Sequence, residues 1–302
     1  MAIFHLSVKT VSRSAGRSAT AAAAYRAGVE IVDERTGQVH DYTRRGGVDR
    51  DHSPGLVMPP DAPAWAADRS ALWNFAEKSE TRKNSTVARE FEIALPDELT
   101  PEQRGALVRE FARALADRHG VAVDAQIHEP GAEGDSRNWH AHVLTSTRRL
   151  GPDGFKEKAR ELDGRKTGPD IVTEWRATWA AMTNRALERA GVVERVDHRS
   201  LADQGGNDRE PTPHLGPSAT MDMRRAQRTG EPAKTERAAQ WVAVRDNNAA
   251  RRRRKISFDL ADERRPRGVF AALLAASAGS APHDDDGCPK PPAARPRGPG
   301  MG

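Results

Sequence analysis

The chain has 302 residues and carries 48 Lys and Arg against 43 Asp and Glu, which gives a formal net charge of +5. Its single cysteine excludes an intrachain disulfide and a cysteine-based zinc site. No apolar run is long enough for a membrane span, and the N-terminal residues lack a signal-peptide core, so we expect a cytoplasmic protein. This excess of basic over acidic residues favours polyanionic partners.

The N-terminal residues predict a strand that leads into a basic loop. Polar and apolar side chains alternate over residues 2–9, which indicates an amphipathic strand with Lys9 on its polar face. Residues 12–18 follow as a flexible loop that contains Arg13 and Arg17. Hydroxyls, backbone amides and guanidinium groups suit phosphate, so we expect this loop to contact nucleic acid.

A short helix is expected next. Ser18 is a good N-cap, residues 19–27 are rich in alanine, and Gly28 is a natural stop. Tyr25 lies near the end of this helix and is followed by Arg26. The neighbouring side chains are too small to enclose the tyrosine ring, which leaves it free to lean toward the sheet.

Residues 29–60 are expected to be irregular. Within them, Tyr42, Arg44 and Arg45 join an aromatic ring to two cations, which suits a single strand held by stacking and phosphate contact. A solvated surface turn is an equally open interpretation. Tyr42 is also the second candidate, beside Tyr25, for any chemistry that needs a phenol.

The middle of the chain predicts helices on either side of one strand. Residues 60–80 form an amphipathic pattern, and a helix is expected over 100–119. Between them, residues 89–95 alternate, so that Glu90 and Glu92 share one face of a strand. Paired carboxylates there are suited to proton transfer or to orienting a metal-ligating histidine, although solvent-facing charges are more common.

A histidine-bearing hairpin organises the predicted fold. Two strands are expected over 121–128 and 139–147, with a turn-rich segment between them. His140 and His142 share one face of the second strand, and His128 ends the first, so antiparallel pairing brings the three together. Three imidazoles suit a divalent metal that keeps open coordination positions, although a chance histidine pair remained an equal alternative.

The C-terminal third is more polar. Residues 148–166 are expected to form a basic loop and residues 170–190 a long helix. We expect a first domain over 1–217, a charged, helical extension over 218–277, and a disordered Pro/Gly/Ala-rich tail over 278–302. The interleaved strands and helices indicate an α+β fold with a central antiparallel sheet flanked by helices.

The sequence resembles the MobA/MobL (MobQ-type) plasmid mobilisation relaxases. The similarity is carried by residues 2–10, 12–14 and 17–28 and by the His-x-His motif at 140–142, and it extends to about residue 217. This resemblance implies an HUH-type relaxase fold, in which a palm-like sheet carries the paired histidines on a central strand. It implies Tyr25 as the nucleophile and His128, His140 and His142 as metal ligands.

The resemblance also implies cofactors and partners. Mg²⁺ or Mn²⁺ is expected, and Zn²⁺ remains possible because three imidazoles bind it more tightly. The substrate would be single-stranded or locally melted DNA at a transfer origin. Accessory mobilisation proteins and a coupling protein are expected as partners. Lys9, Arg13, Arg17, Arg26, Tyr42, Arg44 and Arg45 are the expected DNA contacts.

DNA transesterification needs an activated phenol, because a free phenol has a pKa of about 10. Glu90 and Glu92 are the candidate bases, and the product would be a 5′-phosphotyrosine with a free 3′-hydroxyl. Three alternatives remain open: a hydrolytic metal-dependent endonuclease in which Tyr25 is incidental, a replication-initiator nuclease, and a non-catalytic single-stranded DNA-binding protein.

Overall fold

The computed structural model describes residues 3–131, 135–162, 167–204 and 209–263. The chain divides into two compact units, Met1–Gln204 and Gly205–Gly302, upstream of the boundary expected at residue 217. No helix in the described part of the chain has a stretch apolar enough to cross a membrane. The expected tail at 278–302 lies outside the described residues.

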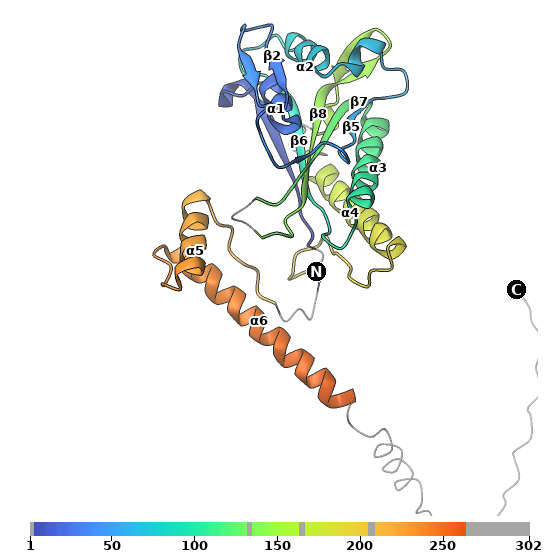
Figure 1. The fold of residues 1–302 in the computed structure, drawn as a ribbon. Helices are drawn as coiled ribbons and strands as arrows, with labels where there is room; N and C mark the ends of the chain where they lie inside the picture. The colour runs from blue at the N-terminus through green and yellow to red at the C-terminus, as the bar shows by residue number, and fades with distance from the viewer. Residues whose placement is uncertain (1–2, 132–134, 163–166, 205–208, 264–302) are drawn as a thin grey trace, which may run out of the picture. The chain divides into compact units, whose positions relative to one another are not determined.

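The first unit is built on a seven-stranded antiparallel sheet (Figure 1). Its strands are β1 (Leu6–Ser12), β4 (Val48–Asp49), β5 (Gly55–Val57), β6 (Thr86–Ala94), β7 (Val121–His128), β8 (His140–Gly151) and β9 (Gly154–Lys158). The main order is β1-β6-β8-β7-β4, with β5 also paired to β7 and β9 paired to β8. The histidine strand β8 is therefore central, and the predicted α+β fold with an antiparallel sheet is confirmed.

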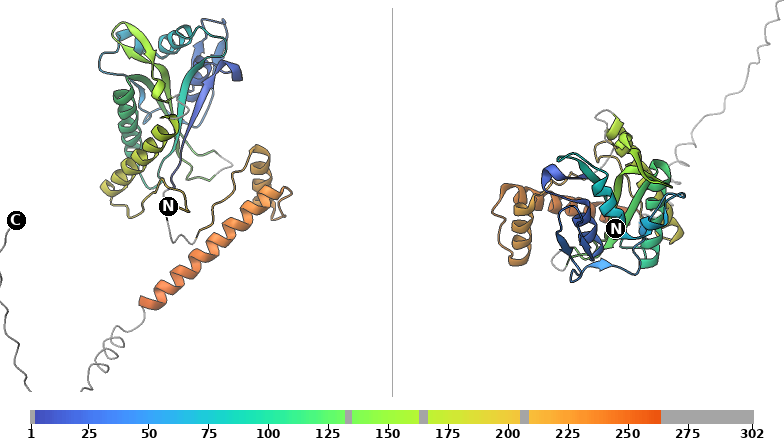
Figure 2. Two further views of the ribbon diagram at one scale, coloured as in Figure 1. Left: turned by 180° about the vertical axis from the view of Figure 1, so that it is seen from behind. Right: turned by 90° about the horizontal axis from the view of Figure 1, so that it is seen from above.

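Helices cover both faces of this sheet (Figures 1 and 2). They are α1 (Ala19–Ala27), α2 (Arg69–Lys78), α3 (Pro101–His119) and α4 (Thr167–Arg189). Side chains of α3 and α4 share one hydrophobic core with the sheet, and side chains of α1 and α2 share the other. A separate hairpin, β2 (Glu30–Val32) and β3 (Val39–Asp41), follows α1.

Side chains along the central strands β6 and β8 alternate between the hydrophobic core and the opposite face of the sheet. Phe91 of β6 and Val143 of β8 are buried in the core shared with α3 and α4. Adjacent residues point to the opposite face, so Glu90, Glu92 and His142 face the α1 side. Apolar packing on one face thus fixes which side chains are presented on the other.

The helix that carries Tyr25 has the predicted bounds and caps. The Ser18 side chain accepts a hydrogen bond from the Ala21 amide, and Gly28 ends α1 with a left-handed φ of 63°. A side chain at Gly28 would be strained in this conformation, and its Cβ would also lie 2.5 Å from the Arg50 side chain.

The second unit contains two helices, α5 (Pro217–Thr229) and α6 (Glu236–Glu263), which pack against each other. Asp222 of α5 accepts hydrogen bonds from the amide and hydroxyl of Thr235, just before α6, and so ties the two helices together. Both helices fall largely within the extension expected over 218–277.

Five sequence-based expectations need correction. The first strand lies at Leu6–Ser12 rather than 2–9, and Arg13 begins a short 3-10 helix instead of a loop. The helix expected over 60–80 is interrupted, because Asp68 has extended backbone and caps α2 with its side chain. The regions expected to be irregular at 29–60 and looped at 148–166 contain short strands, including β9. Strands of two to five residues are too short to show a clear period.

A buried carboxylate locks β9 to the sheet. Glu80, 5% exposed, accepts bonds from Lys158 at 2.8 Å, Arg148 at 2.9 Å and Thr147 at 3.1 Å. Burial raises the pKa of Glu80, but the hydrogen bond and charge of Lys158, with Arg148 and Thr147, outweigh it and lower the pKa. Lys158, in the segment expected to form a basic loop, is therefore held within the fold.

Replacing Glu80 with Gln is expected to reduce the free energy of unfolding by about 3 kcal/mol at pH 7, because it leaves two cations without a carboxylate. The folded-state pKa is lowered, so this contribution is complete above the unfolded-state pKa of about 4.5 and is lost as pH falls below it. Urea unfolding of both proteins at pH 7, 5 and 3.5 measures the difference. A difference that stays constant across this range would contradict the assignment.

Candidate active site

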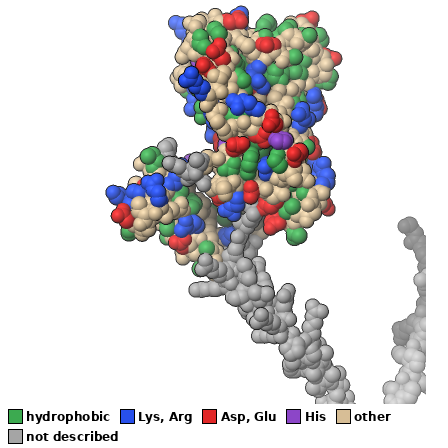
Figure 3. All heavy atoms as spheres, viewed as in Figure 1, with side chains coloured by type: hydrophobic (Ala, Val, Ile, Leu, Met, Phe, Trp, Pro, Cys, Tyr) green, Lys and Arg blue, Asp and Glu red, His purple; other side chains and the backbone are tan. Residues whose placement is uncertain are grey.

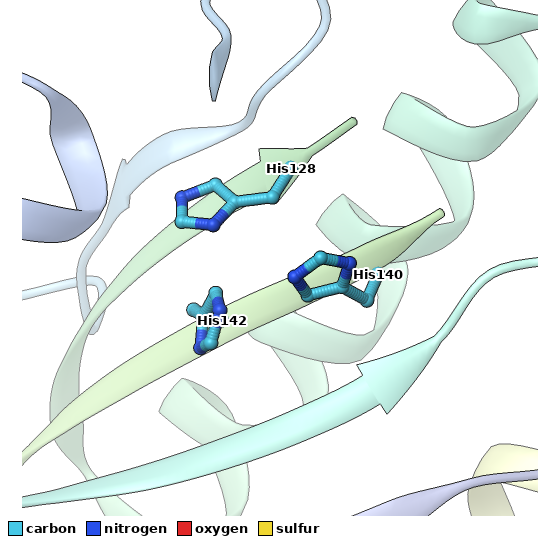
Figure 4. A group of neighbouring side chains, drawn as sticks. All are labelled: His128, His140 and His142. Carbon is cyan, nitrogen blue, oxygen red and sulfur yellow. The ribbon is translucent and has the colours of Figure 1, made fainter. Parts of the chain in front are cut away.

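Three histidines lie together on the face of the sheet that α1 covers. His128 ends β7, and His140 and His142 are the first and third residues of β8. The strand register places His128 opposite His140. One ring nitrogen from each of the three lies within 4.8 Å of the others, and the rings face a common point (Figure 4). The imidazoles therefore converge, as the predicted hairpin requires.

Each ring uses one nitrogen to bind a protein acceptor. These acceptors are the Glu90 carboxylate for His142 at 2.5 Å, the Asn138 carbonyl for His140 at 3.0 Å and the Arg26 carbonyl for His128 at 2.8 Å. A neutral imidazole that donates from one nitrogen keeps a lone pair on the other. Such partners fix the orientation and tautomer of metal-ligating histidines.

The protonation of the cluster also suits a metal. Burial lowers the pKa of His128 to about 3, and the nearby cations add to this effect. Burial likewise lowers the pKa of His140. Both rings are therefore neutral at pH 7, as metal ligation requires. Three imidazoles with oriented second nitrogens fit a divalent ion that keeps open positions.

Tyr25 lies beside this cluster with its side chain accessible. The residue is 43% exposed, and its ring meets the Tyr42 ring edge-on with centroids 5.2 Å apart. The Arg45 guanidinium lies 4.1 Å from the centroid of the Tyr25 ring, and its Nη1 approaches His128 Nε2 at 3.4 Å. One arginine therefore contacts both the phenol ring and the histidine cluster.

Glu90 is tied to the cluster and to α1. Its carboxylate accepts two bonds from Arg26, at 2.5 and 2.6 Å, besides the bond from His142. Burial raises the pKa of Glu90, but the bonds from His142 and Arg26 outweigh it and lower the pKa to about 2. A carboxylate that is so acidic and so fully bonded is a weak base. Of the two roles considered for Glu90, proton transfer and the orientation of a histidine, its geometry fits the orientation of His142.

Glu92 differs in its partner and in its exposure. It lies opposite His142 in the strand register and forms a short ion pair with Lys9. Its side chain is 27% exposed, against 5% for Glu90. Burial raises the pKa of Glu92, and the hydrogen bond and charge of Lys9 outweigh this and lower it. Glu92 therefore remains ionised and more accessible than Glu90.

The phenol, the two carboxylates and one histidine share a single groove. Tyr25, Glu90, Glu92 and His142 all line a cavity of about 1200 Å³ on the α1 face. Other residues that line the groove are Lys9, Arg13, Arg17, Arg26, Asp33, Arg35, Tyr42, Glu80 and Lys83. The chain thus combines a phenol, two carboxylates, one histidine of the cluster and several cations in one accessible cavity.

Arg13 has a different role from the one expected. Its side chain is 10% exposed and donates five hydrogen bonds within the protein. The acceptors are the carboxylate and carbonyl of Glu77 and the carbonyls of Glu80 and Arg82. No guanidinium donor remains for DNA, so Arg13 is omitted from the contacts proposed below. Arg17 and Arg44, in contrast, are exposed.

Two features of the groove were missed from the sequence. Glu77 is 1% exposed and binds both Arg13 and the Ala19 amide, so it anchors the start of α1. Its position four residues after the buried Trp73 was the available signal, because i and i+4 share a helix face. Arg35 and Lys83 lie in turns and carry no signal that distinguishes them from other surface cations.

Comparison with known proteins identifies the family. The profile described as the MobA/MobL family matches residues 17–225. Mobilization protein MobL of Acidithiobacillus ferridurans is 47% identical over 260 residues, which cover 78% of this chain and 66% of the relative. Conjugal transfer protein TraA of Rhizobium radiobacter is 35% identical, over 83% of this chain but only 24% of its own length. The chain thus spans only part of the curated relatives that it matches.

A solved structure, described as the molecular basis of vancomycin resistance transfer in Staphylococcus aureus, has the same fold. It is 33% identical with a TM-score of 0.58, and the match covers 66% of this chain and all of the other. The antiparallel sheet, its flanking helices and the His128–His140–His142 cluster are those of an HUH-type relaxase fold. The chain belongs to the MobA/MobL family of mobilisation relaxases.

Proposed function

We propose that this protein nicks one strand of DNA at a plasmid transfer origin by tyrosine transesterification, pilots that strand in conjugative mobilisation and later rejoins it. The main support is the position of Arg45, which contacts both the Tyr25 ring and His128. A phosphate that reached the phenol would therefore also lie near the histidine cluster and a guanidinium. Such placement favours attack through proximity and charge stabilisation.

The reaction exchanges one phosphoester for another. The Tyr25 oxygen bonds to phosphorus and gives up its proton, while the bond between phosphorus and the 3′-oxygen breaks. The leaving oxygen takes up a proton to become a 3′-hydroxyl, and Tyr25 holds the 5′-phosphate. Because the linkage remains an ester, the reverse attack by a 3′-hydroxyl rejoins the strand without a nucleotide cofactor.

His128, His140 and His142 would hold the divalent metal, for which we propose Mg²⁺ or Mn²⁺. When bound, this ion supplies Lewis-acid stabilisation of the phosphate charge. The protein side chains have distinct tasks around it. Glu90 orients His142 through their 2.5 Å bond. Glu92, which is more accessible than Glu90, is the better candidate to take the phenol proton.

The proposed substrate is single-stranded or locally melted DNA, because a duplex phosphate cannot easily enter such a groove. Lys9, Arg17, Arg26, Tyr42, Arg44 and Arg45 are the proposed contacts. Arg26 and Lys9 already pair with carboxylates, so they would act mainly by balancing charge near the phosphate. Accessory mobilisation proteins and a coupling protein are the proposed partners in the cell.

Covalent adduct mapping tests this function directly. Labelled single-stranded oligonucleotides that cover a candidate transfer origin would be incubated with the protein and Mn²⁺. We expect the label 3′ of the nick to migrate with the protein on a denaturing gel, and peptide mapping to locate it on the tryptic peptide that contains Tyr25. Cleavage that leaves a free 5′-phosphate and no protein adduct would identify a hydrolase instead.

A further inference from the structure

The groove continues away from the histidines toward the start of α1. In the strand register, Lys9 lies opposite Glu90 near the cluster, whereas Ser12 lies opposite Thr86 at the other end. Arg17 follows that end and lies two residues before α1, and six residues of helical rise, roughly 9 Å, separate Ala19 at the start of α1 from Tyr25. Arg17, Arg35 and Lys83 line this part of the groove, here named the cationic subsite.

The acidic side chains that line the groove already bind other groups of the protein. Glu90 is paired with Arg26, and Glu92 with Lys9. Glu80 is paired with Arg148 and Lys158, and Asp33 accepts bonds from Thr20 and from the amides of its own turn. Glu80, Glu90 and Glu92 are therefore occupied by other cations, and only Asp33 interacts electrostatically with a cation of the subsite, Arg35.

The cations of the subsite outnumber the carboxylates that interact with them. Arg17 and Lys83 are exposed, and neither forms an ion pair within the described residues. Arg35 has a 42% exposed side chain, and its one ion-pair contact is at 3.6 Å from Glu77, which Arg13 already binds. Elsewhere, basic and acidic side chains are interspersed on the face of the first unit seen in Figure 3. The subsite therefore retains a net positive charge.

Both walls that present these cations are fixed by buried groups. Asp33, 1% exposed, accepts a bond from Thr20 of α1 at 2.7 Å and bonds from the amides of Arg35 and Thr36. Asn74 of α2 binds the same hairpin at the Val32 carbonyl. Because these walls are rigid, less conformational entropy is lost when a cation on them contacts a phosphate.

Arg13 fixes the opposite wall. It donates to the carbonyls of Glu80 and Arg82, and its own amide donates to the Ser85 carbonyl. These bonds hold the turn that carries Lys83. The arginine expected to touch DNA thus instead shapes the segment that presents another cation.

We propose that the cationic subsite binds phosphates of the single strand that continues from the scissile position at Tyr25. This proposal rests on the proposed nicking function and adds a second region of strand contact to it. The roughly 9 Å of helical rise between Ala19 and Tyr25, with Arg17 two residues beyond it, corresponds to a few nucleotides. Backbone contact of this kind is sequence-independent and depends strongly on salt.

The test is the salt dependence of single-strand binding. An Arg35→Ala/Lys83→Ala protein and a control Arg109→Ala/Arg185→Ala protein lose the same charge, and the control sites lie on α3 and α4, which cover the other face. Fluorescein-labelled dT15 would be titrated by anisotropy between 50 and 200 mM salt. Two lost contacts reduce the slope of log K against log salt by about 1.4, so the affinity deficit shrinks about sevenfold over this range.

The outcomes separate the subsite from the nicking function. A subsite variant that matches its control in both affinity and slope overturns the subsite, and so does wild-type protein that does not bind dT15. Thermal unfolding of each variant checks that the fold is retained. The nicking function is tested by the covalent adduct, which depends on Tyr25 and can fail while the dT15 result stands.

Discussion

Replacing Tyr25 with Phe is expected to abolish DNA cleavage and the covalent adduct, a loss on the order of 10⁴-fold or more. The change removes one oxygen and keeps the ring, which meets Tyr42 edge-on and lies under Arg45. The fold and DNA binding should therefore be preserved. Cleavage of an origin oligonucleotide in Mn²⁺, with anisotropy and thermal unfolding in parallel, measures all three properties.

Tyr42→Phe is the matched control, because it removes the same atom from the only other tyrosine. Tyr42 packs on the α1–α2 core and is less exposed than Tyr25. We expect Tyr42→Phe to retain most activity. If Tyr25→Phe still cleaved DNA, water would be the nucleophile; if only Tyr42→Phe lost the adduct, the nucleophile would be Tyr42.

The strand alternation explains why the histidine site could be predicted from sequence. A period of two places His140 and His142 on one face of their strand, and antiparallel pairing of the two strands brings His128 opposite His140. Helix α1 was equally clear, because Ser18 and Gly28 are strong local signals for its ends. Local chemistry was sufficient in both cases.

The partners of these residues could not be predicted, because they come from distant segments. The chain does not reveal that Glu77 reaches Arg13 or that Arg45 reaches Tyr25, since tertiary packing decides both contacts. Arg13 shows the consequence. An arginine in a Ser/Gly-rich stretch has the same local sequence whether it binds phosphate or, as here, three backbone carbonyls and a buried carboxylate.

Replacing His142 with Ala is expected to remove divalent-metal binding and to reduce cleavage by about 10³-fold or more, because two imidazoles remain and the Glu90 carboxylate loses the ring that it orients. Calorimetric titration with Mn²⁺ measures binding independently of activity. His52→Ala is the matched control, since His52 lies on the segment between β4 and β5 and binds Asp49 rather than the cluster.

The Mn²⁺ affinity and the cleavage activity of Glu90→Gln should lie between those of the wild-type protein and those of His142→Ala. Glutamine keeps the size of the side chain but loses the charge that orients His142 and pairs with Arg26, and a lost partner of a ligating histidine typically costs 10- to 100-fold in metal affinity or activity. The graded order of wild type, Glu90→Gln and His142→Ala is the signature of a metal site with an orienting carboxylate. If Mn²⁺ bound equally to all three proteins, the ion would be held elsewhere and the histidine cluster would not be the metal site.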